Sequence, residues 1–363
     1  MRTPIRVLAI GPAPAGPNSR GGMASVMRLM VDDPDPRVSI RAVPTFVDAG
    51  LLTRLWTGLS GMFVAAGLIL LGRTDVVHIH LSHRGSVVRK SLPLFAARLR
   101  GIATVVHAHS FNFSAWIDPL PEARRRLVRE ALRADRWLVL GQSLSEEYRN
   151  SLGLDPDKVQ VLYNPVELPE LPLTHERDAQ PLLVVALGRL GHRKGTYDLV
   201  RAVELLPETV RTELSVVLAG DGEVAEVREL VAARGLDKVI DVVGWVDASG
   251  RDKLLRRASI FALPSYDEGL PMAVLEAMAY GVVPITTPVG GIPEAVTDGV
   301  DGVLVPPGDP ALLAEALQRL VEGDQLRARL AAAARQRAAA FDISGWRTAL
   351  ADLWFSLAAR QRD

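Results

Sequence analysis

Short apolar runs alternate along the chain with longer segments of helical periodicity. In the first half these runs predict buried strands at residues 5–10, 75–81, 103–108, 136–141 and 158–163. In the second half they predict strands at residues 182–188, 214–220, 239–244, 260–264, 282–287 and 302–307. Strands that are apolar along their whole length and separated by helices are typical of parallel sheets covered on both faces. The pattern therefore predicts an α/β fold with two sets of parallel strands.

A proline-rich segment without periodicity separates the two sets of strands. Residues 164–181 read NPVELPELPLTHERDAQP. Proline removes a backbone donor and fixes φ, so this composition predicts a linker. We therefore expect two Rossmann-like domains, residues 1–163 and 182–345, that face each other across a cleft. Ligands in such folds bind beyond the carboxyl ends of the strands.

Two helical segments need separate interpretation. Residues 346–363 carry apolar side chains at helical spacing and predict a C-terminal helix that packs back on the N-terminal domain. Residues 55–72 carry no charge, and this segment barely reaches the length of a membrane span. Their glycines and the strand that begins at residue 75 favour a helix packed against a sheet, with shallow contact with a bilayer surface as the alternative. The first residues of the chain run directly into a strand, and their apolar part is too short for a secretory signal.

Composition narrows the classes of protein that fit. The 363 residues are 48% hydrophobic and 23% charged, which is typical of a globular protein of two or three domains. The absence of cysteine excludes disulfides, thiolate metal sites and a cysteine nucleophile, and it fits a cytoplasmic protein. Aromatic residues make up 5%, and no basic motif contains interleaved aromatics, so we do not expect a nucleic-acid partner.

Charge is divided unevenly between the two halves. Residues 1–163 hold 21 Lys/Arg and 13 Asp/Glu, a net charge of +8, whereas residues 164–363 hold 21 and 29, a net charge of −8. Two solvent-exposed surfaces whose net charge has no functional role would also give this difference. The sharper interpretation is that the first half faces an anionic partner, either a phospholipid surface or a phosphorylated substrate.

Three segments carry candidate chemistry at the ends of predicted strands. In GPAPAGPNSRGGMASVM a Gly/Pro loop runs into a helix near Gly21 and Gly22, which lets backbone amides approach an anion. The spacing is not that of a dinucleotide fingerprint, so an ordinary turn is the alternative. In LGRLGHRKG, Arg189 and Lys194 suit a diphosphate, because arginine supplies a fork and lysine a point charge. Solvated loop charge is the alternative there.

The third segment, PSYDEGLPMAVLEAM, sets two glutamates around the start of an apolar helix with Pro271 in its first turn. The amides of Gly269 and Leu270 would favour a phosphate at the helix N-terminus. Glu276 could accept hydrogen bonds from the vicinal diol of a ribose, and Glu268 from a sugar ring. A buried glutamate tied to an arginine or a backbone amide is the alternative for Glu276.

The segment EGLPMAVLE, with two glutamates eight positions apart, resembles the signature of retaining glycosyltransferases of family 4, which have the GT-B fold. Other segments resemble the same family, in its order and over essentially the whole chain: RGGM, HIH, HAHSF, LGRLGHRKG, AGDGE, VGWV, PSYDEGLP and TPVGGIPEAVTDGVDGVLVPPGD. Two positions depart from the family pattern. Ser110 stands where glycine is frequent after the histidine of HAH, and Asn164 is followed by proline rather than glycine at the hinge.

The resemblance implies roles for the donor-binding residues. Arg189 and Lys194 would bind the diphosphate of a nucleotide sugar, with UDP or GDP as the nucleotide. Glu276 would hold the ribose hydroxyls, and Glu268 would contact the transferred sugar. The amides of Gly269 and Leu270 would assist Glu268, and the backbone of residues 243–246, including Val246, would meet the base.

The resemblance also implies roles on the acceptor side and a reaction. His109 would lie at the reaction centre, and Gly21 and Gly22 would frame the acceptor and the phosphate. The leaving diphosphate would take the acceptor proton itself in a front-face transfer with retention, with Arg189, Lys194, His109 and Glu268 as the catalytic groups. The acceptor expected is a lipid-linked or polysaccharide precursor, reached by a cytoplasmic enzyme peripheral to the inner membrane face.

Several alternatives stay open at this point. A small soluble acceptor fits the same donor site, and so does a nucleotide-sugar epimerase, a hydrolase or a non-catalytic binder of the same architecture. The pairs His78 and His80, and His107 and His109, each alternate along a strand and point to one face, so a metal site is conceivable. We expect no metal and no cofactor beyond the nucleotide sugar, because Arg189 and Lys194 already supply positive charge at the diphosphate.

Overall fold

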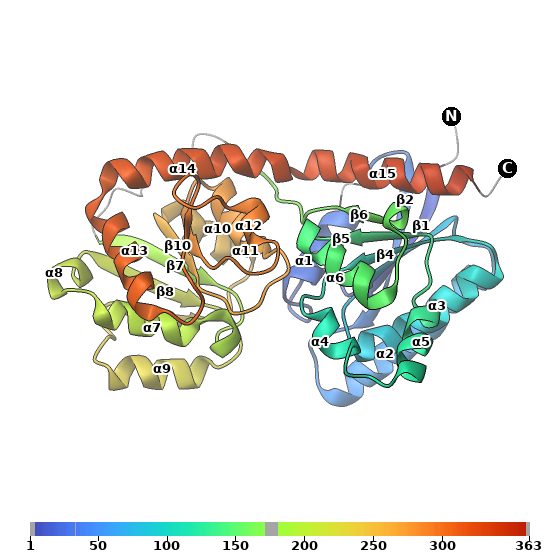
Figure 1. The fold of residues 1–363 in the computed structure, drawn as a ribbon, viewed down its shortest axis with the longest axis horizontal. Helices are drawn as coiled ribbons and strands as arrows, with labels where there is room; N and C mark the ends of the chain where they lie inside the picture. Colours follow the sequence, from blue (N-terminus) through green and yellow to red (C-terminus); the bar gives the residue numbers. More distant parts are fainter. Residues whose placement is uncertain (1–3, 33, 171–180, 361–363) are drawn as a thin grey trace. The chain divides into compact units, whose positions relative to one another are not determined.

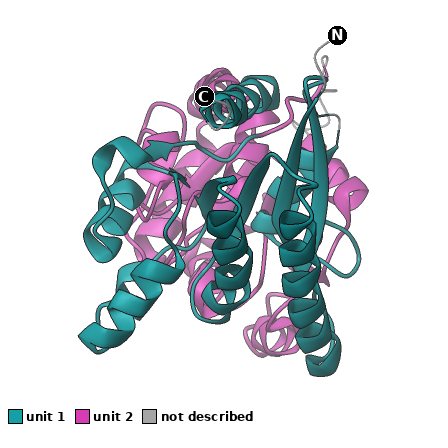
Figure 2. Cartoon of the chain, turned by 90° about the vertical axis from the view of Figure 1, so that its right-hand side faces the viewer, with its two compact units in different colours: residues 1–165, 343–363 teal, residues 166–342 magenta. Residues whose placement is uncertain are grey.

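The computed structural model describes residues 4–32, 34–170 and 181–360. The chain forms two compact units (Figure 2): unit 1 is Met1–Pro165 with Ile343–Asp363, and unit 2 is Val166–Asp342. Residues 171–180 of the predicted linker lie outside the described residues. The Val166 amide donates to the Phe341 carbonyl at 2.8 Å, so the chain enters unit 2 beside the point where it leaves it.

Unit 1 is built on a parallel six-stranded sheet (Figure 1) with the order β2-β1-β3-β4-β5-β6. Its strands are β1 (Ile5–Pro12), β2 (Val38–Phe46), β3 (Val76–Leu81), β4 (Ala103–Ala108), β5 (Arg136–Val139) and β6 (Val159–Val161). Every residue of β3 and β4 is buried, including the three histidines that interrupt their apolar runs. The predicted parallel α/β architecture is confirmed.

The strand β2 is absent from the sequence-based prediction. It is an edge strand of mixed polar and apolar residues, in which Ser39 and Arg41 are exposed whereas Val43 and Thr45 are buried. A search for continuously apolar runs does not detect such a segment. Pro44 is tolerated there because proline removes a ladder donor at little cost on an edge strand.

Helices cover both faces of the unit 1 sheet (Figure 1). They are α1 (Gly22–Val31), α2 (Leu51–Leu70), α3 (Gly85–Leu99), α4 (Phe113–Ile117), α5 (Glu122–Ala131), α6 (Gln142–Leu152), the 3-10 turn η1 (Pro156–Lys158) and α15 (Ile343–Ala359). The C-terminal helix α15 packs against β1 and β3, burying Trp346, Leu350 and Trp354. Its indole side chains thereby complete the core of the N-terminal unit.

Unit 2 repeats the architecture with a parallel sheet in the order β12-β11-β10-β7-β8-β9. Its strands are β7 (Leu182–Leu187), β8 (Leu214–Ala219), β9 (Ile240–Gly244), β10 (Ile260–Leu263), β11 (Val283–Thr286) and β12 (Val303–Leu304). Its helices are η3 (His192–Lys194), α7 (Thr196–Leu205), α8 (Glu208–Arg211), α9 (Val224–Ala233), α10 (Ala248–Arg257), α11 (Met272–Ala279), α12 (Ile292–Ala295), α13 (Pro310–Glu322), α14 (Asp324–Ala338) and η4 (Ala339–Phe341). Alternate strand residues pack with α7, α9 and α13 into one apolar core, which fixes the carboxyl ends of the strands as a rigid edge.

Candidate functional site

The strand order of each sheet locates one crevice per unit. In unit 2 the chain passes from β7 to β8 on one side and returns to β10 on the other side of β7. In unit 1 it passes from β1 to β2 and returns to β3 on the other side of β1. Ligands of such sheets bind at this reversal, beyond the carboxyl ends of the strands. The loops after β7 and β10, and those after β1 and β3, are therefore the candidate binding loops.

The loop after β7 carries both predicted diphosphate ligands. A small hollow at the ends of β7 and β10 is lined by Arg189, Lys194 and Pro264, among other residues. Gly195 makes the turn that follows Lys194, with φ at 66°, and a Cβ there would lie 2.0 Å from the Pro264 carbonyl oxygen. Only glycine combines this backbone angle with this close approach. Gly195 thereby brings the lysine up against the loop after β10.

Lys194 and Glu268 form a buried ion pair at the junction of these two loops. The Lys194 ammonium donates to Glu268 Oε1, and Ser265 Oγ donates to the same oxygen at 2.8 Å. Arg193 lies 3.9 Å from that oxygen. Burial lowers the pKa of Lys194, while the Glu268 carboxylate opposes this shift. Two residues 74 positions apart in the sequence are thus held together without a ligand.

Arg189 stands apart from this pair. Its side chain is 71% exposed and lies 3.9 Å from Asp221. The structure brings Lys194 and Glu268 together and leaves the Arg189 guanidinium at the rim of the hollow, where it is accessible to a ligand. An exposed pair of this kind contributes little to folding stability.

The helix α11 has the predicted burial, with a small difference at its start. Pro271 lies at the N-cap position, one residue before the helix, rather than in its first turn. Gly269 and Leu270 precede it, and the Gly269 carbonyl accepts from the Gly291 amide at 2.6 Å. The helix α11 therefore begins beside the loop that carries Glu268. A helix N-terminus next to such a loop is the geometry expected of an anion site.

Glu276 is the one charged side chain of α11, and it is paired with an arginine. Arg251 of α10 contacts Glu276 Oε1 at 2.7 Å, and 13% of the Glu276 side chain is exposed. This pairing is the alternative that the sequence left open. It leaves a partly exposed carboxylate held in one orientation at the edge of the crevice. Arg251 was not predicted, because a partner 25 positions away on another helix leaves no local signal.

The remaining predicted donor-side residue follows β9. Val246 is partly exposed, and the next residue, Asp247, caps α10 by accepting from the Gly250 amide at 2.8 Å. The cap fixes the path of the chain from β9 into α10. The backbone near Val246 thus lies at the carboxyl edge of the same sheet as Lys194 and Glu268.

In unit 1 the glycine-rich loop after β1 is held by short polar contacts. Ser19 Oγ donates to the Ala13 carbonyl at 2.6 Å, and the Arg20 amide donates to Asp48 at 2.6 Å. Gly21 has φ at 92° and lies at the N-cap of α1, which begins at Gly22. The loop therefore presents the start of α1 at the carboxyl edge of the sheet, where the sequence predicted it.

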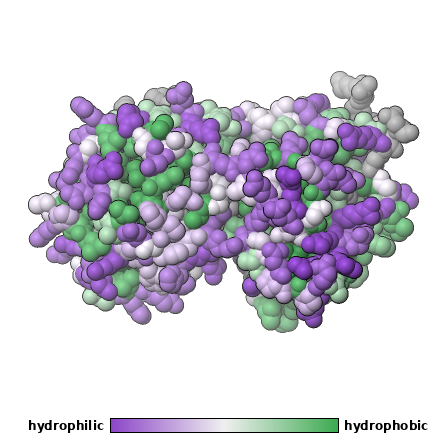
Figure 3. Space-filling view, viewed as in Figure 1, coloured by the Kyte–Doolittle hydropathy of each residue, from purple (hydrophilic) through white to green (hydrophobic). Residues whose placement is uncertain are grey.

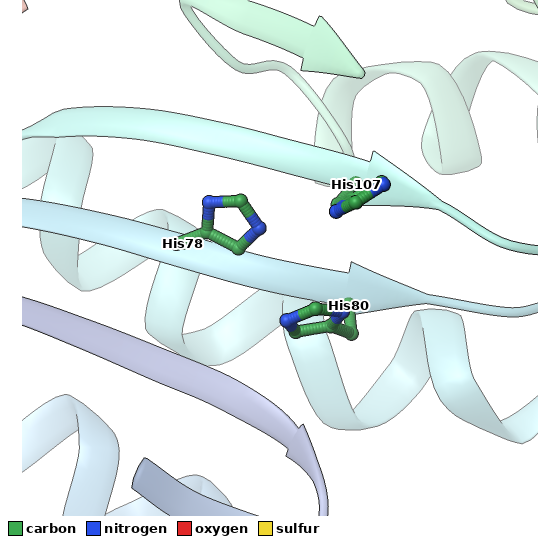
Figure 4. Close-up of side chains that lie close together, drawn as sticks. All are labelled: His78, His80 and His107. Carbon is green, nitrogen blue, oxygen red and sulfur yellow. The ribbon is translucent and has the colours of Figure 1, made fainter. Parts of the chain in front are cut away.

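His109 follows β4 and belongs to a cluster of four imidazoles. His80 Nδ1 lies 2.9 Å from His109 Nε2, and the ring centroids of His107 and His109 are 4.2 Å apart. Figure 4 shows His78 and His80 on β3 and His107 on the neighbouring strand. The prediction that each pair shares one face of its strand agrees with this arrangement. The cluster lies inside unit 1, with His109 at its outer, partly exposed end.

These histidines are neutral at pH 7. Burial lowers the pKa of His78 and of His109 to about 3, and it lowers the pKa of His80 and His107 far below the usual value. His78 Nδ1 accepts from the Trp354 indole at 3.2 Å. Because an indole only donates, the proton of the neutral His78 ring lies on Nε2. His109 can therefore exchange hydrogen bonds with a ligand but carries no charge to it.

Three of the imidazoles meet the distance requirement for a metal candidate. One nitrogen from each of His78, His80 and His107 lies within 4.8 Å of the others, and ring nitrogens of all three lack a hydrogen-bond partner within the described residues. Zinc bonds of about 2.0–2.1 Å bring tetrahedral ligands closer than that, to about 3.4 Å. The nearby Lys90 ammonium, whose pKa burial lowers to about 7, disfavours a further cation. Imidazole nitrogens are suitable zinc ligands, whereas the positive charge of the nearby Lys90 opposes zinc binding.

The departure at Ser110 has a visible consequence. Ser110 Oγ lies 2.6 Å from His83 Nδ1, and the Ser110 carbonyl accepts from Tyr148 Oη at 3.1 Å. A glycine would provide no hydroxyl for His83. Ser110 therefore ties the loop after β4 to the loop after β3, at the crevice of unit 1.

Comparisons with known protein families match both halves of the chain. Residues 20–170 match the model described as "Glycosyltransferase Family 4", and residues 170–337 match "Glycosyl transferases group 1". A D-inositol 3-phosphate glycosyltransferase of Corynebacterium efficiens is 30% identical over 80% of this chain and 73% of its own length. An alpha-D-kanosaminyltransferase of Streptomyces kanamyceticus is 26% identical over 97% of this chain and 94% of its own.

Solved structures share the fold. Anabaena Alr3699/HepE in complex with UDP superposes with a TM-score of 0.77, covering 97% of this chain and all of that one at 19% sequence identity. The same protein has been solved with UDP-glucose. At this identity the likeness concerns the arrangement of strands and helices, and it agrees with the two parallel sheets described above.

Proposed function

The chain belongs to the group 1 glycosyltransferases of the family 4 type, with the GT-B fold, and from this membership we propose that it transfers a sugar, with retention, from a nucleoside-diphosphate sugar to a hydroxyl acceptor. The donor is proposed to carry UDP or GDP. The solved relative with UDP and UDP-glucose supports a nucleotide-sugar donor.

The observation that carries this proposal is the meeting of Lys194 with the N-terminal end of α11 at the reversal of the unit 2 sheet. Cleavage of a glycosyl phosphate concentrates negative charge on the leaving diphosphate. A cation and helix amides held there in advance stabilise that charge where it develops. Arg189, exposed at the rim, can close on the outer phosphate without disturbing the fold.

Retention is proposed from what surrounds the sugar position. Glycosidases place two carboxyl groups across the bond as acid and nucleophile. Glu268 instead accepts hydrogen bonds from Lys194 and Ser265 through Oε1, and no second carboxyl group is proposed across the bond. In our proposal Glu268 orients the sugar hydroxyls, and the leaving phosphate oxygen accepts the proton of the acceptor from the same face.

Glu276 is proposed to bind the ribose. Replacing it by alanine should weaken binding of the free nucleotide as well as the nucleotide sugar, because a charge-assisted hydrogen bond contributes about 1.5–3 kcal/mol. Calorimetric titration with UDP and GDP measures this loss. The matched variant Glu268→Ala should affect the nucleotide sugar far more than the free nucleotide. Unchanged nucleotide affinity in a folded Glu276→Ala protein would mean that Glu276 serves only as the ion-pair partner of Arg251.

The reaction is proposed to need no resident metal. Because Lys194, Arg189 and the α11 amides supply the positive charge, we expect protein treated with a chelator and then freed of it to retain its full rate. Elemental analysis of the purified protein should find less than one bound metal ion per chain. Stoichiometric zinc that is lost in a His107→Leu variant would refute this and assign the imidazole cluster to a metal.

The acceptor is proposed to be a lipid-linked or polysaccharide precursor at the cytoplasmic face of a membrane. The net charge of +8 in residues 1–163 supports an anionic acceptor for the unit that carries His109. His109, neutral at pH 7, would hydrogen-bond the acceptor or the sugar rather than attract its charge. The relative named for D-inositol 3-phosphate supports the second candidate, a small phosphorylated acceptor in solution.

A panel of UDP- and GDP-sugars, read first by thermal shift and then by product formation, tests the proposal. We expect one donor to stabilise the protein and to be consumed only when an acceptor is added. NMR of the product then gives the anomeric configuration. Consumption without an acceptor would indicate a hydrolase, and an inverted product would exclude the retaining route.

A further inference from the structure

The helix α2 (Leu51–Leu70) is apolar on two opposite faces, although only one of them is buried. Within the described residues it is the one helix long and apolar enough to cross a membrane, and about a third of its apolar window is buried inside the protein. The buried face consists of small residues together with Ile69: Gly58, Gly61, Ala65, Ala66 and Ile69. A surface helix normally carries polar side chains on its outer face.

The buried face is fitted closely to the unit. A Cβ on Gly61 would lie 2.0 Å from the Pro44 carbonyl oxygen of β2, and one on Gly58 would lie 2.9 Å from the Arg89 side chain of α3. The helix therefore cannot cross a bilayer without leaving β2 and α3. It can only lie along a surface.

The outer face of α2 carries large apolar side chains. Leu52 is 82% exposed, Trp56 is 71% exposed and Phe63 is 61% exposed. The whole exposed set on α2 and its end is Leu51, Leu52, Leu55, Trp56, Leu59, Phe63, Val64, Leu70 and Leu71. We call this set, with the exposed apolar residues of α3, the α2–α3 face.

The neighbouring helix α3 extends this apolar surface. Val88, Phe95 and Leu99 are exposed at helical spacing, and α3 packs along α2. Figure 3 shows apolar surface gathered at the lower end of unit 1, where α2 lies in Figure 1. Exposed apolar side chains gathered on two packed helices mark a binding surface, whereas apolar side chains scattered singly do not.

The charged residues of α2 and α3 themselves all have one sign. Neither α2 nor α3 contains an acidic residue, and residues 51–100 hold six arginines and one lysine against the single carboxylate of Asp75. Asp75 is paired with Arg6 at 2.7 Å. Arg54 stands near the start of α2, and Arg100 lies beside its end at Gly72. The face is therefore apolar with a cationic rim.

We propose that the α2–α3 face docks this protein onto an anionic lipid bilayer, with α2 lying in the plane of the interface and Leu52, Trp56 and Phe63 inserted among the lipids. An apolar helix face flanked by arginine matches this surface in both hydrophobicity and charge. A second copy of the chain fits less well, because two such faces would bring like charges together. Such docking would bring the protein to the lipid-linked acceptor of the proposed function. The docking itself rests on the surface of α2 and α3, and only its purpose rests on the proposed function.

The test is sedimentation of the full chain with vesicles of phosphatidylcholine alone or of phosphatidylcholine and phosphatidylglycerol in equal parts. We expect the protein to pellet with the anionic vesicles at low salt, to be partly released at high salt, and to pellet weakly with phosphatidylcholine. No donor or acceptor is present, so a negative result leaves the proposed reaction untouched. Failure to pellet with either lipid at low salt overturns the docking proposal.

Matched variants separate this face from general stickiness. Leu52→Gln/Trp56→Gln should weaken vesicle binding at least about tenfold, because two large apolar side chains no longer leave water. Val300→Gln/Leu312→Gln alters exposed apolar residues of unit 2 and should change nothing. Arg54→Gln and Arg100→Gln should each cost about fivefold and flatten the salt dependence.

Further measurements on these variants distinguish lipid docking from misfolding and from dimerisation through the α2–α3 face. Thermal unfolding of Leu52→Gln/Trp56→Gln should match the parent, because both side chains are exposed. Equal losses in the unit 2 variant would overturn the proposal. So would a lipid-independent dimer, seen by sedimentation equilibrium and abolished by Leu52→Gln/Trp56→Gln, since a second copy would then cover the face.

Discussion

Replacing Lys194 by methionine is expected to lower kcat by about 100- to 1000-fold while weakening donor binding by less than about tenfold. The charge on the diphosphate is larger in the transition state than in the bound donor, so a cation aimed at it acts mainly on the rate. Removal of one donor from such a site costs about 2.7–4 kcal/mol in other enzymes. Steady-state kinetics with a separate measurement of donor Kd distinguishes the two effects.

The ion pair with Glu268 complicates this variant and also supplies its control. Lys194→Met leaves a buried carboxylate with Ser265 and a more distant arginine, so the protein could lose stability as well as rate. Lys194→Met/Glu268→Gln removes the uncompensated charge and should restore the melting temperature without restoring kcat. Arg201→Ala, on the exposed ion pair with Glu204, should leave both unchanged. Equal losses in kcat and in donor affinity would mean that Lys194 stabilises the bound donor and the transition state to the same extent.

Arg189 should follow the same trend with a smaller loss. Its guanidinium is exposed and held only loosely by Asp221 at 3.9 Å, so part of its attraction to the diphosphate is screened by water. We therefore expect Arg189→Ala to lower kcat less than Lys194→Met does. A larger loss would mean that the loop after β7 changes its conformation when the donor binds.

The second large effect is acid unfolding of unit 1, which we expect between about pH 5.5 and pH 4. His78 and His109 have a pKa of about 3 in the folded protein, and the pKa of His80 and His107 is also far below normal. The unfolded chain binds protons near pH 6.5 instead. The contribution of these histidines to the free energy of unfolding is therefore fully present above pH 6.5. It is lost as the pH falls below that value, because the unfolded chain takes up protons first.

The size of this loss follows from the number of imidazoles. At pH 5 each neutral buried histidine costs about 2 kcal/mol relative to its unfolded form, so the three fully buried rings of His78, His80 and His107 cost about 6 kcal/mol. Domains have only about 5–15 kcal/mol of stability in total. Tryptophan fluorescence measures the transition, since Trp137 and Trp354 are buried in unit 1 and Trp245 is the only tryptophan of residues 166–342.

A variant isolates the contribution of one ring. His107→Leu removes one proton-binding group whose nitrogens lack partners within the described residues, so it should shift the midpoint to lower pH. His192→Gln alters the one histidine in the described part of unit 2, which is exposed, and should have no effect. A unit 1 that stays folded at pH 4 would show that the imidazoles reach water.

Several features of this protein were predictable because their causes are local. Parallel strands that are buried on both faces are predominantly apolar, so β3, β4, β7 and β10 can be recognised one by one. The two-unit α/β fold and the family follow from such runs and from motifs read in order. The edge strand β2 shows the limit, because its partial burial leaves a mixture of polar and apolar residues rather than an apolar run.

The sequence by itself also determined which residues lie at the carboxyl ends of the strands, since Arg189, Glu268 and His109 each lie in the loop that follows a strand. The tertiary structure decided what those side chains touch. It placed Lys194 on Glu268, 74 positions away, and Arg251 on Glu276. It also gathered the histidines of two strands into one buried cluster and left the outer face of α2 uncovered. Partners are chosen by packing between elements distant in the chain, and residue type and spacing record only what happens within one element.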